Sequence, residues 1–133
     1  MKSIKLALAA LVVSTFAYAK GSDVNTIMAS MEQGLNNIQK GFLYNSVELI
    51  KSGTAQVQKE NMVYLQDRKE IQNMLPKGKQ QMENVAMITS QRIEHAAVEI
   101  NTYLELKEMR KAQDAYTSMV KACSDCHTIV RGW

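Results

Sequence analysis

Strand-forming patterns are scarce in this sequence. Its 133 residues include only 6% aromatic residues, and the runs of valine, isoleucine and threonine that would predict β-strands are missing. Proline occurs once and glycine six times, so little interrupts the chain. Alanine, glutamine, glutamate, lysine, leucine and methionine are frequent instead, and these residues favour helices. The composition therefore predicts an all-α fold.

A large surplus of one charge is missing as well. The whole chain has 16 Lys and Arg against 13 Asp and Glu, a formal net charge of +3. If residues 1–19 are removed, as argued below, 14 basic residues remain against 13 acidic ones. Acidic and basic residues alternate along the chain without a long block of one sign. This pattern argues against nucleic-acid binding, which depends on a basic patch.

Long hydrophobic runs are confined to the N-terminus. The stretch MKSIKLALAALVVSTFAYA begins with two lysines, continues with the apolar run Leu6–Val13 and ends in an A-x-A pattern at Ala19. That order is typical of a secretory signal peptide, the alternative being an uncleaved anchor. The run is short of the roughly 20 apolar residues that span a bilayer, and no later stretch is apolar enough. We therefore expect residues 1–19 to be a cleaved signal peptide. Residues 20–133 are then one small periplasmic domain without stable membrane insertion.

Amphipathic stretches make up the rest of the chain. Apolar residues recur at intervals of three and four, as on one face of an α-helix. The intervals predict four helices. Three of them cover about 24–41, 47–57 and 82–100, and the fourth begins between 103 and 111. Residues 61–74 are either the end of the second helix or a separate short turn. Short connections between these helices predict an antiparallel up-down four-helix bundle.

Several residues are expected to set the helix boundaries. Pro76 and Gly78, in the sequence LPKGK, form the strongest break in the chain. Gly41 is expected to end or bend the first helix, and Asp23 or the serine before it to cap its start. Thr102 or the asparagine before it is expected to cap the last helix.

The sequence CSDCH near the C-terminus has the most distinctive chemistry. On a helix, Cys123 and Cys126 are three residues apart and His127 is four residues after Cys123, so the three side chains share a face. Two thiols at this separation can form thioether bonds to the vinyl groups of a haem, and the adjoining imidazole can bind its iron. Export agrees with this interpretation, because such attachment takes place outside the cytoplasm. We therefore expect one haem c per chain, linked through Cys123 and Cys126 and ligated by His127.

Three other interpretations of the motif compete. A zinc site would need a fourth ligand, for which distant His95 is the remaining candidate. A thioredoxin-like dithiol would need a βαβ pattern, which is not visible. A disulfide between Cys123 and Cys126 would be strained within one helix. His95 could also be a second imidazole ligand of a haem, or pair with Glu94 or Glu99 on its own helix.

With this motif at the C-terminus of an exported four-helix chain, the sequence resembles the class II c-type cytochromes, the cytochrome c-prime family. The resemblance covers essentially residues 20–133. Family members continue the motif with two variable residues, an aromatic residue and a basic residue. Arg131 matches the basic position, whereas Val130 departs from the usual aromatic. Arg131 is expected to pair with a haem propionate, or to stabilise the helix C-terminus as a cation.

The resemblance also draws attention to the first helix. Family members have a distal residue facing the open side of the iron, a methionine three residues later and an aliphatic residue ten later. Met28, Met31 and Ile38 stand at these intervals, while Val24 replaces a basic residue that many members carry. Met28 is thus the expected second iron ligand opposite His127, as in the low-spin branch, and Met31 is the alternative. Periodicity alone would make Met28 a core residue.

The expected function is electron transport by a periplasmic monohaem cytochrome that docks with redox partner proteins. The alternative is a five-coordinate cytochrome c-prime that binds nitric oxide or carbon monoxide at an open iron. A small helical binding module without haem is the third interpretation. No nucleophile, base or pair of carboxylates surrounds the motif, so an enzyme is not expected. The resemblance also implies a homodimer formed through the first two helices.

Overall fold

The computed structural model describes residues 23–132, and within them every regular element is helical. The expected signal peptide with its cleavage site at Ala19 lies outside the described residues. The elements are α1 (Val24–Tyr44), α2 (Val47–Tyr64), α3 (Arg68–Met74), the short 3₁₀ helix η1 (Gln80–Met82), α4 (Glu83–Glu105) and α5 (Met109–Arg131). The all-α expectation is therefore confirmed for the described residues.

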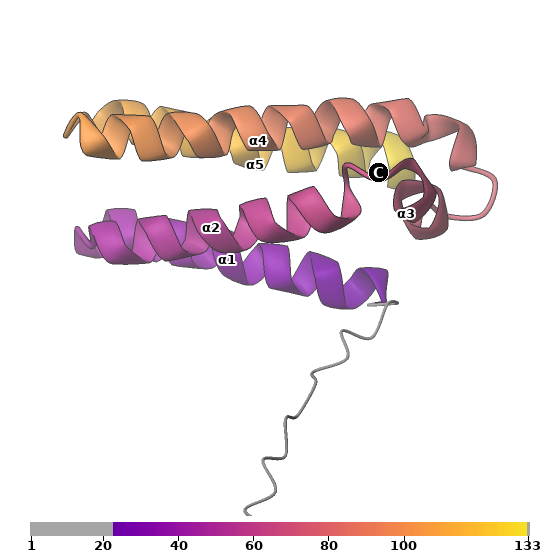
Figure 1. Cartoon of the computed structure of the whole chain (residues 1–133), viewed down its shortest axis with the longest axis horizontal. Coiled ribbons are helices and arrows are strands. Elements are labelled where there is room, and N and C mark those ends of the chain that lie inside the picture. Colours follow the sequence, from indigo (N-terminus) through magenta and orange to yellow (C-terminus); the bar gives the residue numbers. More distant parts are fainter. Residues whose placement is uncertain (1–22, 133) are drawn as a thin grey trace, which may run out of the picture.

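The four long helices form two antiparallel hairpins, α1–α2 and α4–α5, which lie one above the other (Figure 1). The short helix α3 lies at one end of the bundle, and both hairpin turns lie at the other end (Figure 1). Contacts between the hairpins run mainly from α2 to α4, whereas α1 and α5 touch each other only sparsely. The bundle is thus closed along the α2–α4 side and looser along the α1–α5 side.

The core consists of the apolar faces of the four long helices. Ile38, Ile50, Ile100 and Met119, one from each long helix, are fully buried. Helices α1 and α2 pack backbone against backbone, because a Cβ on Gly53 would lie only 2.5 Å from the carbonyl oxygen of Gly34. Tight packing of the first hairpin thus depends on the absence of a side chain at these glycines.

A buried polar contact joins α2 to α4. The amide nitrogen of Asn61, on α2, donates to the backbone oxygen of Ser90, on α4, at 3.1 Å. One turn earlier on α2, Gln58 donates to the carboxylate of Glu94 at 2.9 Å. The Asn61 side-chain oxygen and the Ser90 hydroxyl are buried without a protein partner. The junction between the two hairpins is therefore partly polar and incompletely satisfied.

Two expected helix boundaries agree with the structure. Residues 75–79 separate α3 from η1 and α4, as the LPKGK break predicts. Asp23 is the N-cap residue of α1, although its side chain makes no capping hydrogen bond. The segment 61–74 combines the two expected arrangements, because α2 runs to Tyr64 and the remainder contains a separate helix, α3.

Two other expectations were wrong, and so was one of the two alternatives for Gly41. Gly41 does not end α1, which continues to Tyr44 and stops at Asn45 in the left-handed conformation, φ 55°. Thr102 does not cap the last helix. It lies inside α4, where its hydroxyl donates to the backbone oxygen of Val98. Ile88, which the apolar intervals over 82–100 predict to be buried, is exposed. Among residues 23–132, no helix is both long enough and apolar enough to cross a bilayer.

Candidate functional site

A cavity of about 720 Å³ lies between α1 and α5 at the end of the bundle that carries α3. It exists because α1 and α5 stay apart there, and α3 and α4 supply its remaining walls. Further along the bundle the two helices meet. The Tyr116 hydroxyl donates to the backbone oxygen of Leu35 at 3.3 Å, and the Tyr116 ring lies 5.9 Å from that of Phe42. These contacts mark the inner end of the cavity.

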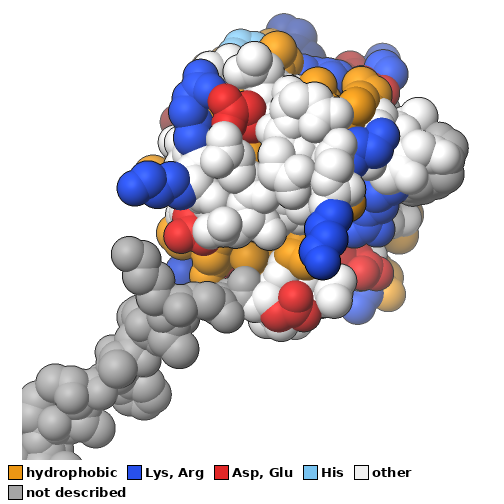
Figure 2. All heavy atoms as spheres, turned by 90° about the vertical axis from the view of Figure 1, so that its right-hand side faces the viewer, with side chains coloured by type: hydrophobic (Ala, Val, Ile, Leu, Met, Phe, Trp, Pro, Cys, Tyr) orange, Lys and Arg blue, Asp and Glu red, His pale blue; other side chains and the backbone are white. Residues whose placement is uncertain are grey.

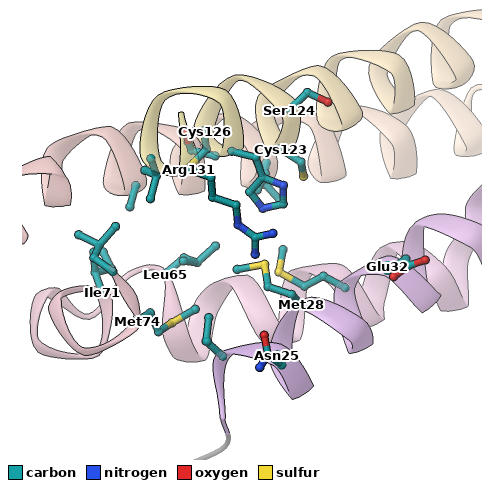
Figure 3. Close-up of a pocket in the computed structure, with 18 of the residues that line it drawn as sticks. Asn25, Met28, Glu32, Leu65, Ile71, Met74, Cys123, Ser124, Cys126 and Arg131 are labelled. Atoms are coloured by element: carbon teal, nitrogen blue, oxygen red, sulfur yellow. The ribbon is translucent and has the colours of Figure 1, made fainter. Parts of the chain in front are cut away.

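Cys123, Cys126 and His127 all line this cavity from α5. The helix continues without interruption from Met109 to Arg131, so the i, i+3 and i+4 spacing places the three side chains together as expected. Figure 3 shows both cysteines on the side of α5 that faces the cavity. Both are free thiols. The structure thus presents two thiols and an imidazole to one space.

Burial alters the acidity of both thiols. It raises the pKa of Cys123 to about 11, with a further contribution from neighbouring Cys126. Burial also raises the pKa of the Cys126 thiol, while a hydrogen bond with Thr89 acts in the opposite direction. Both groups are therefore protonated at neutral pH in the chain without a cofactor.

The environment of His127 favours the neutral form of its imidazole. Burial lowers its pKa first, and the positive charge of Arg131 lowers it further. A neutral imidazole retains the nitrogen lone pair that a metal ion needs. The surroundings of His127 therefore favour the form that can ligate iron.

Met28 and Met31 line the same cavity from α1, opposite the motif. Figure 3 shows the Met28 side chain extending from α1 into the space between the helices. Met28 is half-buried, whereas Met31 is only 5% exposed and belongs to the hydrophobic core. Ile38, the third residue of the family interval, is fully buried in the core away from the cavity lining. The structure thus brings both candidate methionines to the cavity.

Arg131 reaches into the cavity mouth. Its guanidinium extends from the last turn of α5 into the space between α5 and Met28 (Figure 3). Within residues 23–132 it forms no ion pair with an acidic side chain. A cation at the opening of an apolar cavity is suited to the carboxylate of a bound molecule.

The wall contributed by Leu65 and α3 was not predicted from the sequence. Leu65, Ile71 and Met74 line the cavity, and Figure 3 shows Met74 directed toward it from α3. Residues 61–74 lack a clear helical period, so the sequence predicts no role for them in the site. The signal that could have found them is local: Asp67 precedes Arg68 and can cap a short helix. Its carboxylate does accept from the backbone amides of Lys69 and Glu70.

His95 lies outside the cavity. Its side chain is 76% exposed and lies 3.5 Å from the Glu99 carboxylate, one turn along α4. It is therefore not placed to be an iron ligand or a fourth zinc ligand. In the part of the chain that the structure describes, no group of three or more His, Cys, Asp or Glu side chains could hold a metal ion.

The exterior near the site carries mixed charges. On α5, Asp125 accepts from Lys121 and from Arg92 of α4, both at 3.0 Å, and these contacts lower its pKa. Figure 2 views the α3 end, where basic and acidic side chains are both visible around the periphery. This end shows no patch of a single sign.

Comparison with known proteins adds no relative. No protein-family model, no curated protein and no solved structure matches the chain.

The residues themselves must therefore show whether a haem fits. The cavity volume falls within the roughly 300–1,000 Å³ typical of cofactor sites. Its lining is largely apolar, with two thiols, an imidazole and three thioethers. This set of donors, together with Arg131 at the mouth, fits haem c.

Proposed function

We propose that this chain is an exported monohaem cytochrome of the class II c type that carries electrons. The observation that supports the proposal best is the convergence of Cys123, Cys126 and His127 with Met28 and Met31 on one apolar cavity. A chance C-x-x-C-H on a surface helix would have no reason to face a space of this size.

Haem c, when bound, supplies a single iron that exchanges one electron at a time. Cys123 and Cys126 would hold it on α5, and the His127 imidazole would provide one ligand of the iron. Met28 or Met31 would provide the other from α1. Ligands from two separate helices would keep the surroundings of the iron similar in both oxidation states.

The remaining wall residues are mostly apolar. Ile71 and Met74 from α3 and Ile93 from α4 close the end and side of the cavity with apolar surface. A dry surrounding raises the redox potential of a bound iron centre, because it disfavours the more highly charged ferric state. Arg131 would pair with a propionate at the mouth, as its position there supports.

The experiment is expression in a host that attaches haem to exported cytochromes. The purified protein is expected to be coloured and heavier than its polypeptide by one haem, with a low-spin spectrum that carbon monoxide does not change. A colourless product with the mass of the bare polypeptide would contradict the proposal. Mass measurement also tests whether the mature chain begins after Ala19.

Substitution identifies the second ligand. Met28→Ala is expected to give a high-spin spectrum and rapid carbon monoxide binding, because it removes the thioether that enters the cavity from α1. Met31→Ala and Met74→Ala test the other two methionines of the lining. Met62→Ala is the matched control, since Met62 is exposed on α2. A wild-type protein that binds carbon monoxide readily would instead favour the five-coordinate, gas-binding alternative.

Periplasmic location, docking with redox partner proteins and a homodimer through α1 and α2 are further parts of this proposal. They depend on the N-terminal segment and on the resemblance. Sedimentation of the haem-loaded protein measures its oligomeric state.

A further inference from the structure

The end of the bundle farthest from the cavity carries an unusual surface. Both hairpin turns lie there, at Asn45 and at Lys107 (Figure 1). Among residues 23–132, the three most exposed large hydrophobic side chains are Leu43 at 72%, Tyr44 at 71% and Leu106 at 60%. All three lie at these two turns, where polar residues are normally found. We call this surface the turn tip.

The fold does not require these apolar side chains. Each precedes a residue in the left-handed conformation, Asn45 with φ 55° or Lys107 with φ 58°. Helices that end in this way often bury an apolar side chain against the preceding turn. Here that role is filled by others, because Phe42 and Leu104 pack on the core while Leu43, Tyr44 and Leu106 remain in solvent.

Basic residues outnumber acidic ones at the turn tip, where the acidic side chains are Glu48, Glu105 and Glu108. Lys40 lies one turn before Tyr44 on α1, and Lys107, Arg110 and Lys111 follow Leu106. Lys111 pairs with Glu108 and lies over the Tyr103 ring. Within residues 23–132, Lys40, Lys107 and Arg110 form no ion pair. Their charges are therefore available to an external anionic partner.

We propose that the turn tip binds reversibly to an anionic lipid surface. Protruding leucine and tyrosine side chains can enter the boundary between headgroups and acyl chains, where aromatic rings are favoured. Lysine and arginine beside them meet anionic headgroups, each contributing about 1 kcal/mol near the surface. In the docked molecule the long axis of the bundle points away from the membrane, and the cavity lies at the end that remains in water (Figure 1). This proposal does not depend on haem.

A lipid surface fits the turn tip better than two other occupants. A second copy would bring two surfaces with the same excess of positive charge together, and like charges oppose association. A protein partner would need hollows shaped to receive the side chains, over about 800 Å² for a stable contact. Lipid headgroups need no such complementary shape.

The test is co-sedimentation of the protein, purified after export, with vesicles of phosphatidylglycerol and phosphatidylcholine in equal amounts. Binding is expected, together with loss of binding on pure phosphatidylcholine and in about 0.5 M salt. Leu43→Ser with Leu106→Ser is expected to lower the apparent partition coefficient about tenfold or more. Lys107→Glu with Arg110→Glu should have an effect of similar size.

Matched controls separate the turn tip from general surface properties. Met62→Ser with Ile88→Ser removes two apolar side chains that are each 58% exposed elsewhere, and should leave binding unchanged. Lys69→Glu with Lys77→Glu makes the same change of charge at the opposite end. Absence of binding to anionic vesicles, or an equal loss in the controls, would overturn the proposal. Self-association that depends on Leu43 and Leu106 would overturn it in favour of a homodimer.

Discussion

Tyr116 on α5 donates its phenolic hydrogen to the backbone oxygen of Leu35 on α1, across the side of the bundle where the two helices are least in contact. The same ring rests against Phe42 at a centroid distance of 5.9 Å. One side chain therefore does much to hold α1 against α5 beside the cavity.

Two substitutions of Tyr116 should lower the stability of the protein to different degrees. Tyr116→Phe is expected to lower the free energy of unfolding by about 1 kcal/mol, because it deletes one hydrogen bond and keeps the ring. Tyr116→Ala should cost about 3 kcal/mol, since the packing on Phe42 is lost as well. Urea unfolding measures both. Tyr44→Phe, at an exposed position, should change nothing, and an equal effect there would contradict this account.

Gly53→Ala should destabilise the protein although alanine is the better helix former. In an exposed helix the change would stabilise by about 1 kcal/mol. Here the new Cβ would lie 2.5 Å from the Gly34 carbonyl oxygen and 2.8 Å from the Ile38 nitrogen, and backbone atoms cannot yield cheaply. We expect a loss of about 2 kcal/mol or more, measured by thermal unfolding. Ser52→Ala, one residue earlier and exposed, is the control; unchanged stability of Gly53→Ala would show that the two helices can separate freely.

Two substitutions at the α2–α4 junction should affect the free energy of unfolding very differently. Ser90→Ala removes a buried hydroxyl that has no partner, so stability should stay within about 0.5 kcal/mol or rise. Asn61→Ala removes the hydrogen bond to the Ser90 backbone and leaves a cavity, at a cost of about 2–3 kcal/mol. Denaturant unfolding distinguishes them. A large loss for Ser90→Ala would mean that its hydroxyl has an ordered water as a partner.

Thiol chemistry in the chain made without haem should depend strongly on pH. The thiolate is the reactive form, and a pKa of about 11 leaves roughly a hundredfold less thiolate at pH 8 than the usual value of 9.0. Alkylation of Cys123 should therefore be slow at pH 8, rise with each pH unit toward about 11, and become fast in urea. The Cys126→Ser variant isolates this thiol; rapid alkylation of it at pH 8 in the folded chain would contradict the burial.

The same pKa shift has a consequence for stability. The unfolded chain releases the Cys123 proton near its ordinary pKa, whereas the folded chain retains it to about pH 11. The free energy of unfolding should therefore fall as the pH rises from about 9 to 11 and not below that range. The Cys123→Ser variant should lack this part of the pH dependence.

Much of the architecture was predictable from apolar spacing. The four long helices have core residues every three or four positions, and one of them places Cys123, Cys126 and His127 on a single face. That part of the site follows from local geometry alone. Met28 and Met31 became candidate iron ligands because their spacing matches that of the family. The structure places both in the lining of the same cavity.

The failures occurred where burial outweighed local preference. Asn101 and Thr102 resemble a helix stop, yet α4 continues to Glu105 because Ile100 and Leu104 are buried on the core. Helix α3 has a single buried residue, Ile71, and seven residues are too few to show a period. Met74 could not be assigned to the cavity without knowing that α3 lies across the end of the bundle.

The sparse contact between α1 and α5 has a consequence for the order of assembly. The hairpins are joined along α2 and α4, and Tyr116 ties the opposite side only beyond the cavity. A flat molecule can therefore enter edgewise from solvent and reach both thiols while the rest of the protein is already folded. Cofactor insertion would then be a late step that takes place between α1 and α5. Its rate would depend on how readily these two helices move apart beside the cavity.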